Sequence, residues 1–439
     1  GIVLTYLGIA KKWEPLLLVP IGFSVIIVNL FPGLMSASLD IEAPINGEVT
    51  HVISVEEGKT IDVEEGTLLF RIKSSDGAIE EVVAKGDGEL SQENIKFETG
   101  DRVYAHDKMA TLDDVSILVD GSYSTGLLSR IFQYGIMWEL IPPLIFFGLG
   151  ALTDFGPLIS NPKTLILGAG GQFGVYFVMF LAVLMGSGWI PGIDFGIKEA
   201  CSIGIIGGAD GPTTVFLTNK MAPHLLGATA VSAYTYMAMV PIIQPPVIRA
   251  LCSKKERAIY MKPVMRQVSN KEKILFPFIG TIVIILLVPD SAPLIGSFML
   301  GNLLLVCGVT DRLAKTAGED FMNVLTILLG MSVGGIMTAE HFLRLDSILV
   351  FVLGLIAFAS ATAFGILIAK LMNKVSKEQI NPMIGAAGVS AVPMAARVVQ
   401  AEGQKANPRN FLLMHAMGPN IAGVIGTATA AGVFLALVG

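Results

Sequence analysis

Residues 204–214, which read GIIGGADGPTT, lie between two long apolar runs and constrain this chain more than any other stretch. Four glycines and one proline interrupt any continuous helix there, and Asp210 adds an ionisable group. Irregular backbone at membrane depth must be buried in protein or line a water-filled cavity. An ionisable residue at that depth indicates a functional site. The alternative is a glycine-rich loop just outside the membrane, with Asp210 solvated.

The composition is typical of a membrane protein. Of the 439 residues, 53% are hydrophobic and only 15% are charged, which is too apolar for a soluble globular domain. Apolar runs of about twenty residues recur, and this length suits a helix that crosses a bilayer. The three cysteines show no CxxC spacing and the five histidines show no zinc-binding spacing. We therefore expect neither a disulfide nor a zinc site.

The order of the segments predicts a polytopic all-α membrane protein. We expect two repeat halves that contain broken or re-entrant segments, plus a small inserted all-β barrel-sandwich domain. The predicted parts are N-terminal membrane helices at 1–35, an acidic lipoyl-like β insert at 40–120, a first membrane repeat at 126–250, a basic cytoplasmic loop with linking helices at 251–320, and a second membrane repeat at 321–439.

The insert differs from the rest of the chain in charge and in pattern. Residues 40–120 contain 20 acidic and seven basic side chains, and their short alternating runs are separated by glycine and acidic turns. This sequence pattern resembles that of the lipoyl/biotinyl barrel-sandwich family. The modified lysine of that family sits in a Met-Lys-Met-type hairpin, whereas Lys73 lies in the stretch 72–77, which reads IKSSDG. We therefore expect a carrier-like fold without the carrier's modification.

Basic residues fix the expected orientation in the membrane. Eight of them lie between Arg249 and Lys273, and the positive-inside rule assigns that loop to the cytoplasm. Lys11 and Lys12 form a short basic loop that is also expected on the cytoplasmic side, so the insert is expected to be extracytoplasmic.

The second half of the chain repeats the layout of the first. Residues 381–397 read NPMIGAAGVSAVPMAAR and interrupt the apolar pattern as residues 204–214 do. In each half, a last helix with an internal proline follows the interruption. Paired interruptions at corresponding positions indicate a transporter site at a repeat interface near the membrane midplane. The repeats are inverted if the number of crossings between them is odd.

Several polar side chains on these segments suit a hard cation such as Na⁺. Asp210 supplies one carboxylate, and one carboxylate beside one cation is nearly neutral, which lowers the cost of burying either. Backbone carbonyls freed by the broken helices supply further oxygens. The neutral side-chain donors are Thr213, Thr214, Asn381, Ser390 and Asn420.

Four other residues leave alternatives open. Arg397 would either pair with Asp210 or hold a carboxylate substrate in a bidentate manner. Tyr234 and Tyr236 would be interfacial belt residues, or one of them would face the bundle and relay a proton. We expect His415 to be a packed or hydrogen-bonded helix residue rather than a catalyst.

Long motifs connect the chain to a known family. Residues 204–213, 236–246 and 381–397 resemble the β subunit of sodium-pumping, biotin-dependent decarboxylases, and so do residues 146–157 and 411–426. The resemblance implies decarboxylation of carboxybiotin, which a separate subunit carries, coupled to outward Na⁺ transport with uptake of one H⁺ from the outer side. Members of the family serve oxaloacetate, methylmalonyl-CoA, glutaconyl-CoA or malonate decarboxylases. The insert at 40–120 is expected to depart from the common family pattern.

The resemblance also assigns roles to residues. It makes Asp210 the central Na⁺-binding and coupling carboxylate, gives Ser390 a part in Na⁺ or proton handling, and matches Tyr236 to a tyrosine needed for coupled turnover. The full set that we expect at the site is Tyr236, Ser390 and Arg397 for catalysis, Arg397 and Asn381 for carboxybiotin, Asp210, Ser390, Asn381, Thr213 and Asn420 for Na⁺, and Gly207, Gly208 and Gly385 on the broken segments.

The partners implied by the resemblance are a carboxyltransferase subunit, a biotin carrier subunit and a small membrane subunit. We expect them to form an oligomer in the cell membrane, and we expect no nucleic acid partner. The main alternative function is a secondary Na⁺-coupled carboxylate transporter, which would use the same residues without bond cleavage. A structural scaffold that presents the insert is a third possibility, but it leaves Asp210 and Arg397 unexplained.

Overall fold

A computed structural model describes the chain except for a set of short segments: it covers residues 1–11, 15–31, 37–55, 59–64, 66–74, 77–84, 88–105, 107–112, 123–124, 127–189, 195–262, 266–337, 345–376 and 379–439. The end of the predicted insert, 113–120, and two residues of the Lys73 stretch, Ser75 and Asp76, lie outside the described residues. The chain forms two compact units, one of Gly1–Ile26 with Gly135–Gly439 and one of Ile27–Tyr134.

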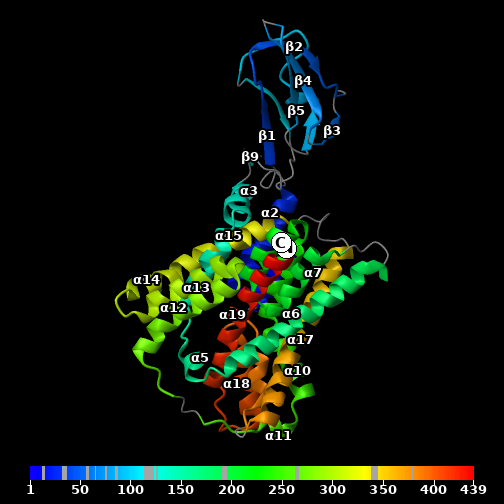
Figure 1. Ribbon diagram of the computed structural model, residues 1–439. Coiled ribbons are helices and arrows are strands. Elements are labelled where there is room, and N and C mark those ends of the chain that lie inside the picture. Colours follow the sequence, from blue (N-terminus) through cyan, green and yellow to red (C-terminus); the bar gives the residue numbers. More distant parts are fainter. Residues whose placement is uncertain are drawn as a thin grey trace. The chain divides into compact units, whose positions relative to one another are not determined.

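The helical unit is built from apolar helices that alternate with short breaks (Figure 1). Up to the first broken segment its elements are α1 (Ile2–Ala10), α2 (Pro15–Leu30, which ends in the other unit), η3 (Gln133–Met137, shared in the same way), α4 (Ile141–Leu152), α5 (Gly156–Ser160), α6 (Thr164–Leu184), η4 (Met185–Trp189), α7 (Ile197–Gly204), η5 (Ile205–Gly208) and α8 (Gly211–Met221).

The remaining elements of this unit run to the end of the chain. They are η6 (Pro223–Leu225), α9 (Leu226–Ala238), α10 (Val240–Leu251), α11 (Lys254–Arg257), α12 (Asn270–Leu287), η7 (Pro289–Ser291), α13 (Ala292–Val306), α14 (Asp311–Thr316), η8 (Ala317–Phe321), α15 (Met322–Gly335), α17 (Leu345–Val375), η9 (Pro382–Ala387), α18 (Met394–Ala406) and α19 (Leu413–Val438).

Within the described residues, four continuous helical stretches are long and apolar enough to cross a bilayer: Thr164–Ser187, Pro289–Val306, Leu345–Val375 and Leu413–Val438. Two bent pairs raise the number to six if each pair is one span, Leu127–Met137 with Ile141–Leu152 and Pro223–Ala238 with Val240–Leu251. These helices agree with a polytopic membrane protein.

The span that begins near residue 223 is not one straight helix that ends at Pro245 and Pro246. The chain instead bends by 68° between α9 and α10, and α10 continues through both prolines to Leu251. Pro241 lies in the first turn of α10, where a missing N–H costs no helical hydrogen bond. The buried Gln244 side chain donates to the Ala386 carbonyl oxygen at 2.8 Å, which fastens α10 to η9 despite the two prolines.

The core of the helical unit brings the two halves of the sequence together. α6 packs along both α17 and α19, and α17 in turn contacts η5 and η9. Glycine permits the closest approach: a Cβ atom at Gly385 of η9 would overlap the Gly365 carbonyl oxygen of α17, and the reverse substitution would do the same. The short breaks are therefore enclosed by long apolar helices rather than exposed to lipid.

The second unit is a small antiparallel β structure with its own apolar core. It includes α3 (Leu127–Phe132) and η2 (Gln92–Asn94). Its strands are β1 (Ala37–Glu42), β2 (Gly47–Val52), β3 (Thr60–Val63), β4 (Leu68–Lys73), β5 (Ile79–Val83), β6 (Gly88–Ser91), β7 (Arg102–Val103), β8 (Lys108–Leu112) and β9 (Tyr123–Ser124). They form sheets in the orders β8-β1-β9, β5-β4-β2-β7 and β3-β6.

Lys73 ends β4 at an exposed position, opposite Ile79 of β5 and Glu48 of β2. In the turn that follows, Gly77 adopts a φ of 89° and donates to the Ser74 carbonyl oxygen. The antiparallel strands and buried apolar faces agree with the expected all-β segment.

Candidate functional site

The first broken segment ends in a left-handed turn that presents Asp210. After η5, Ala209 has a φ of 55°, and Asp210 then caps the N-terminus of α8. Its carboxylate oxygen Oδ1 accepts a 3.1 Å hydrogen bond from the Thr213 N–H. Pro212 lies in the first turn of α8, where it is readily accommodated. The helix N-terminus thus directs its free N–H groups toward a negative charge.

The second broken segment has the same plan. Asn381 caps η9, which ends before Gly388, and an irregular stretch that contains Ser390 leads to α18. In both segments a short 3₁₀ turn, a few non-helical residues and a new helix follow one another. The interruptions predicted from glycine and proline are therefore present in the structure.

The two segments touch through Ser390. Its N–H donates to the Gly208 carbonyl oxygen at 2.7 Å, and its hydroxyl donates to Oδ2 of Asp210 at 2.6 Å. These residues lie 180 positions apart in the sequence. Backbone groups freed by the first interruption are thus satisfied by the second.

The Asp210 side chain is buried, with 3% of its surface exposed, so the alternative of a solvated loop residue is wrong. Among the described residues, Asp210 forms no ion pair, and Arg397 does not approach it as a counter-ion. A buried carboxylate without a cationic side chain needs a proton or a bound cation for neutrality. The site is therefore suited to exchange one for the other.

Three buried oxygens on the surrounding helices make no hydrogen bond with a described residue: Thr213 Oγ1, Tyr234 Oη and Asn420 Oδ1. The Thr213 hydroxyl lies beside the Asp210 carboxylate. Asn420 of α19 donates through Nδ2 to the Val389 carbonyl oxygen, next to Ser390. Since unpartnered buried oxygens are costly, their presence around one carboxylate favours a bound cation or water.

Small residues bring the helices close to this crossing. A Cβ atom at Gly208 would overlap the side chain of Thr427 on α19, and one at Gly211 would overlap the ring of Tyr234. At Gly207 the nearest atoms would belong to Ala357 of α17, at 3.0 Å. The glycines of the first segment therefore set how closely α9, α17 and α19 surround Asp210.

The Thr214 hydroxyl, a further predicted donor, donates to the Asp210 carbonyl oxygen at 2.8 Å. The structure does not bring Asn381, Arg397 or Tyr236 to the Asp210 carboxylate. Asn381 donates through Nδ2 to the carbonyl oxygens of Arg257 and Ile259, and its Oδ1 accepts from the Met383 N–H. Arg397 is exposed on α18. The Tyr236 hydroxyl donates to the Phe351 carbonyl oxygen of α17.

His415 contacts the Lys262 carbonyl oxygen at 2.8 Å through Nε2, in agreement with a hydrogen-bonded helix residue.

Sequence reasoning gave no role to three polar residues of the core. Gln244 of α10 donates to η9. Gln172 of α6 and Thr427 of α19 contact each other at 3.3 Å beside Gly208. The available signal was a lone amide or hydroxyl in an apolar helix, which marks a position that faces other helices rather than lipid.

Known proteins match this chain over nearly its full length. Residues 1–438 match the family described as "Na+-transporting oxaloacetate decarboxylase beta subunit". Methylmalonyl-CoA decarboxylase subunit beta from Propionigenium modestum is 46% identical over 438 residues, which cover 100% of this chain and 93% of the relative. Oxaloacetate decarboxylase beta chain from Klebsiella pneumoniae is 45% identical over 439 residues, with 99% and 93% covered.

Glutaconyl-CoA decarboxylase subunit beta from Acidaminococcus fermentans is 57% identical over 305 residues, which cover 70% of this chain and 79% of the relative. The family match includes residues 40–120, so the expectation that the insert departs from the family pattern is not supported.

Proposed function

The chain belongs to the family of Na⁺-transporting oxaloacetate decarboxylase beta subunits, and from this premise we propose that Na⁺ binds where its two broken segments cross. Members of this family are sodium-translocating decarboxylase subunits that couple decarboxylation to Na⁺ export, and this membrane protein is one of them. The hydrogen bond between Ser390 and Asp210 carries the proposal, because it joins both segments at a buried carboxylate.

The proposed ion ligands are the Asp210 carboxylate, the hydroxyls of Ser390 and Thr213, and the Asn420 side-chain oxygen. In the structure, the Ser390 hydroxyl directs its proton at Asp210. A cation beside the carboxylate would require that hydroxyl to turn its oxygen toward the ion. Na⁺ entry and loss of a proton are thereby linked at one place, because the buried site tolerates only one positive charge.

Asn381 has a positioning role in this proposal. Its amide nitrogen donates to the carbonyl oxygens of Arg257, at the end of α11, and of Ile259, which ties the start of η9 to that stretch. Its amide oxygen accepts from the Met383 N–H within η9. The residue therefore holds the second broken segment in place rather than binding the ion directly.

We propose that carboxybiotin, delivered by a biotin carrier subunit, approaches α18, where the exposed Arg397 orients its carboxylate. Proton delivery to the biotin ureido nitrogen promotes loss of CO₂. Ser390 lies at the buried carboxylate and is suited to pass that proton, whereas Tyr236 ties α9 to α17 and keeps the crossing in register. The carboxyltransferase, the carrier and a small membrane subunit are the proposed partners in an oligomer.

The two segments also support the proposal of two repeat halves that move against each other. α6 precedes the first break and α17 precedes the second, and each of them contacts both η5 and η9. Movement of one half would open the crossing to either side of the cell membrane. In this arrangement the basic loop around α11 faces the cytoplasm and the β unit, as a barrel sandwich of the biotinyl type, faces outward.

The test is simultaneous measurement of CO₂ release and ²²Na⁺ uptake by the complete complex in liposomes. The proposal is supported if CO₂ release from carboxybiotin depends on Na⁺ and is accompanied by ²²Na⁺ uptake. Uptake that is driven by a carboxylate gradient without CO₂ release would contradict it and favour the secondary transporter.

A further inference from the structure

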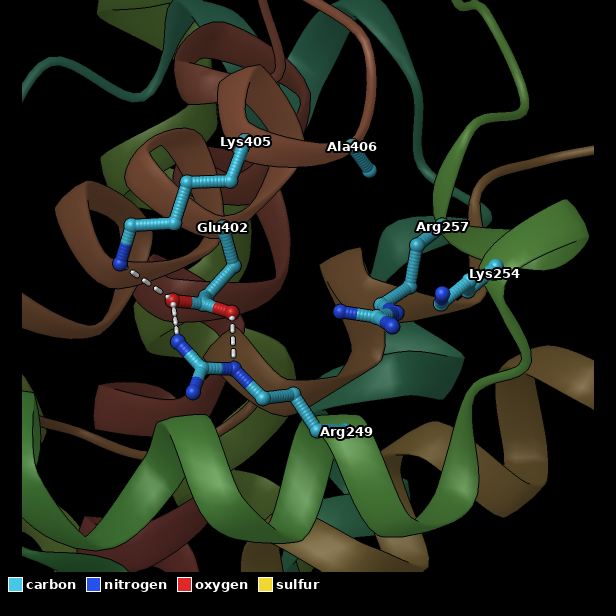
Figure 2. Close-up of a pocket in the computed structure, with 6 residues that line it drawn as sticks. All are labelled: Arg249, Lys254, Arg257, Glu402, Lys405 and Ala406. Atoms are coloured by element: carbon cyan, nitrogen blue, oxygen red, sulfur yellow. Dashed lines mark hydrogen bonds and ion pairs between the residues drawn. The ribbon is translucent and has the colours of Figure 1, made fainter.

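A basic cavity lies at the ends of α10 and α18, apart from the crossing at Asp210. It has a volume of about 420 Å³, and its lining is formed by Arg249, Lys254, Arg257, Glu402, Lys405 and Ala406 (Figure 2). Four cationic side chains therefore share the cavity with a single carboxylate. Such an excess of positive charge favours an anionic occupant.

The Glu402 carboxylate is already paired with two of the four cations. Arg249 donates to both oxygens of Glu402 at 2.8 Å, and Lys405 donates to Oε1 at 2.8 Å. Only 2% of the Glu402 side chain is exposed. This side of the cavity is a preformed ion-pair network with one positive charge in excess, and its geometry is fixed by the bidentate Arg249 contact.

The other side carries cations without a carboxylate partner. Lys254 and Arg257 of α11 lie across the cavity from the network (Figure 2), and neither forms an ion pair with a described residue. The Arg257 Nε atom is buried and makes no hydrogen bond within the described part of the chain. A buried guanidinium nitrogen without an acceptor is costly, so an acceptor from outside the chain is expected there.

The backbone of α11 is held independently of these two side chains. Ser253 and Glu256 form a capping box, and Glu256 pairs with Lys370 at 2.9 Å. The Asn381 side chain binds the Arg257 carbonyl oxygen and leaves the guanidinium untouched. Lys254 and Arg257 are thus presented into the cavity by a fixed element. This arrangement is expected of a binding site rather than of a structural ion pair.

We propose that this cavity binds a phosphate group. Two unpaired cations opposite a third positive charge match a dianionic or doubly phosphorylated ligand, whereas a single carboxylate would leave one cation unpaired. The Arg257 fork suits phosphate oxygens, and Lys254 adds a point charge. The group would come either from the headgroup of cardiolipin, which basic pockets between membrane helices bind on the cytoplasmic side, or from a soluble phosphate compound. The site does not depend on the proposed Na⁺ site.

The test uses the full chain purified with its copurifying subunits in neutral detergent. The midpoint of thermal unfolding is measured as a function of potassium phosphate concentration. Potassium acetate and potassium chloride at equal ionic strength are the controls, and the use of potassium salts keeps the Na⁺ concentration constant. We expect saturable stabilisation by phosphate that acetate does not reproduce. The half-saturating phosphate concentration should rise at least tenfold in Lys254→Gln and Arg257→Gln. Lys255→Gln, which removes the adjacent lysine outside the cavity lining, should behave like wild type.

Native mass spectrometry separates the two sources. Cardiolipin that is retained by wild type and by Lys255→Gln, but lost from both cavity variants, identifies the lipid headgroup. Phosphate stabilisation without retained cardiolipin identifies a soluble ligand. Three outcomes would each overturn the proposal. Phosphate and acetate could stabilise equally, or both cavity variants could respond to phosphate as wild type does. The third outcome is the lack of any saturable response together with no retained lipid.

Discussion

The Ser390 hydroxyl donates a 2.6 Å hydrogen bond to Oδ2 of Asp210, and these two residues come from the two interrupted segments of the chain. A second contact, from the Ser390 N–H to the Gly208 carbonyl oxygen, fixes the same pair of segments through their backbones. Removal of the hydroxyl therefore leaves the crossing intact but deletes one proposed ligand of the ion.

Ser390→Ala should raise the Na⁺ concentration for half-maximal decarboxylation by about tenfold to a hundredfold, because a hydrogen bond to a charged group is worth about 1.5–3 kcal/mol. The midpoint of thermal unfolding without Na⁺ should also fall, because the substitution removes the hydrogen bond to the buried Asp210 carboxylate. Ser332→Ala is the matched control, since Ser332 is also buried but donates within its own helix to Leu328. An unchanged Na⁺ response in Ser390→Ala would count against its place at the ion.

Tyr234 and Tyr236 should have separable effects. Tyr234→Phe removes a buried hydroxyl without a partner among the described residues, so Na⁺ affinity should change while stability is kept. Tyr236→Phe removes the contact to the Phe351 carbonyl oxygen, so turnover should fall while equilibrium Na⁺ binding persists. ²²Na⁺ binding and CO₂ release measured on both variants test this, and the reverse assignment of the two effects would contradict it.

Gly385→Ala should lower the unfolding midpoint markedly. The new methyl group would overlap the Gly365 backbone, and such overpacking costs about 1–3 kcal/mol. At Gly296 of α13, a Cβ atom would meet nothing within 4 Å, so Gly296→Ala should be neutral or stabilising through helix propensity. Scanning calorimetry in detergent measures both, and equal midpoints would show that close approach at Gly385 is not needed.

Acid should weaken the link between α10 and α18. The hydrogen bonds from Arg249 lower the pKa of Glu402 from 4.5 to about 2, despite its burial, with a further contribution from Lys405. The stabilisation from a lowered carboxyl pKa is present above 4.5 and is lost as the pH falls from 4.5 toward 2. The unfolding midpoint of Glu402→Gln should thus lie below wild type at neutral pH and approach it as the pH falls. A difference that stays constant with pH would contradict this.

The sequence was sufficient to locate the two interruptions, because glycine and proline within apolar runs break a membrane helix, and a lone carboxylate there is too costly to bury without a function. The sequence could not show which of Tyr234 and Tyr236 faces the crossing. Residues two apart in a helix point about 200° away from each other, so only one of them can face the crossing, and apolar neighbours on all sides give no periodicity to decide which.

The exposed position of Arg397 and the hydrogen-bond partners of Asn381 also could not be predicted from the sequence. Arg397 lies only seven residues after Ser390, yet α18 turns it to an exposed position. The partners of Asn381 are backbone carbonyls about 120 residues away, which no local pattern reveals. The path of α10 through Pro245 and Pro246 also depends on tertiary packing, because the Gln244 side chain is held by its contact with η9.

The most direct test of the Na⁺ site is equilibrium ²²Na⁺ binding to the purified complex, with Asp210→Asn compared against wild type. Asp154→Asn is the control, because Asp154 is an exposed carboxylate paired with Lys273 at 3.3 Å. Loss of saturable binding in Asp210→Asn, with normal binding in Asp154→Asn, is the result that the proposed site predicts. Saturable Na⁺ binding of wild-type affinity in Asp210→Asn would contradict it.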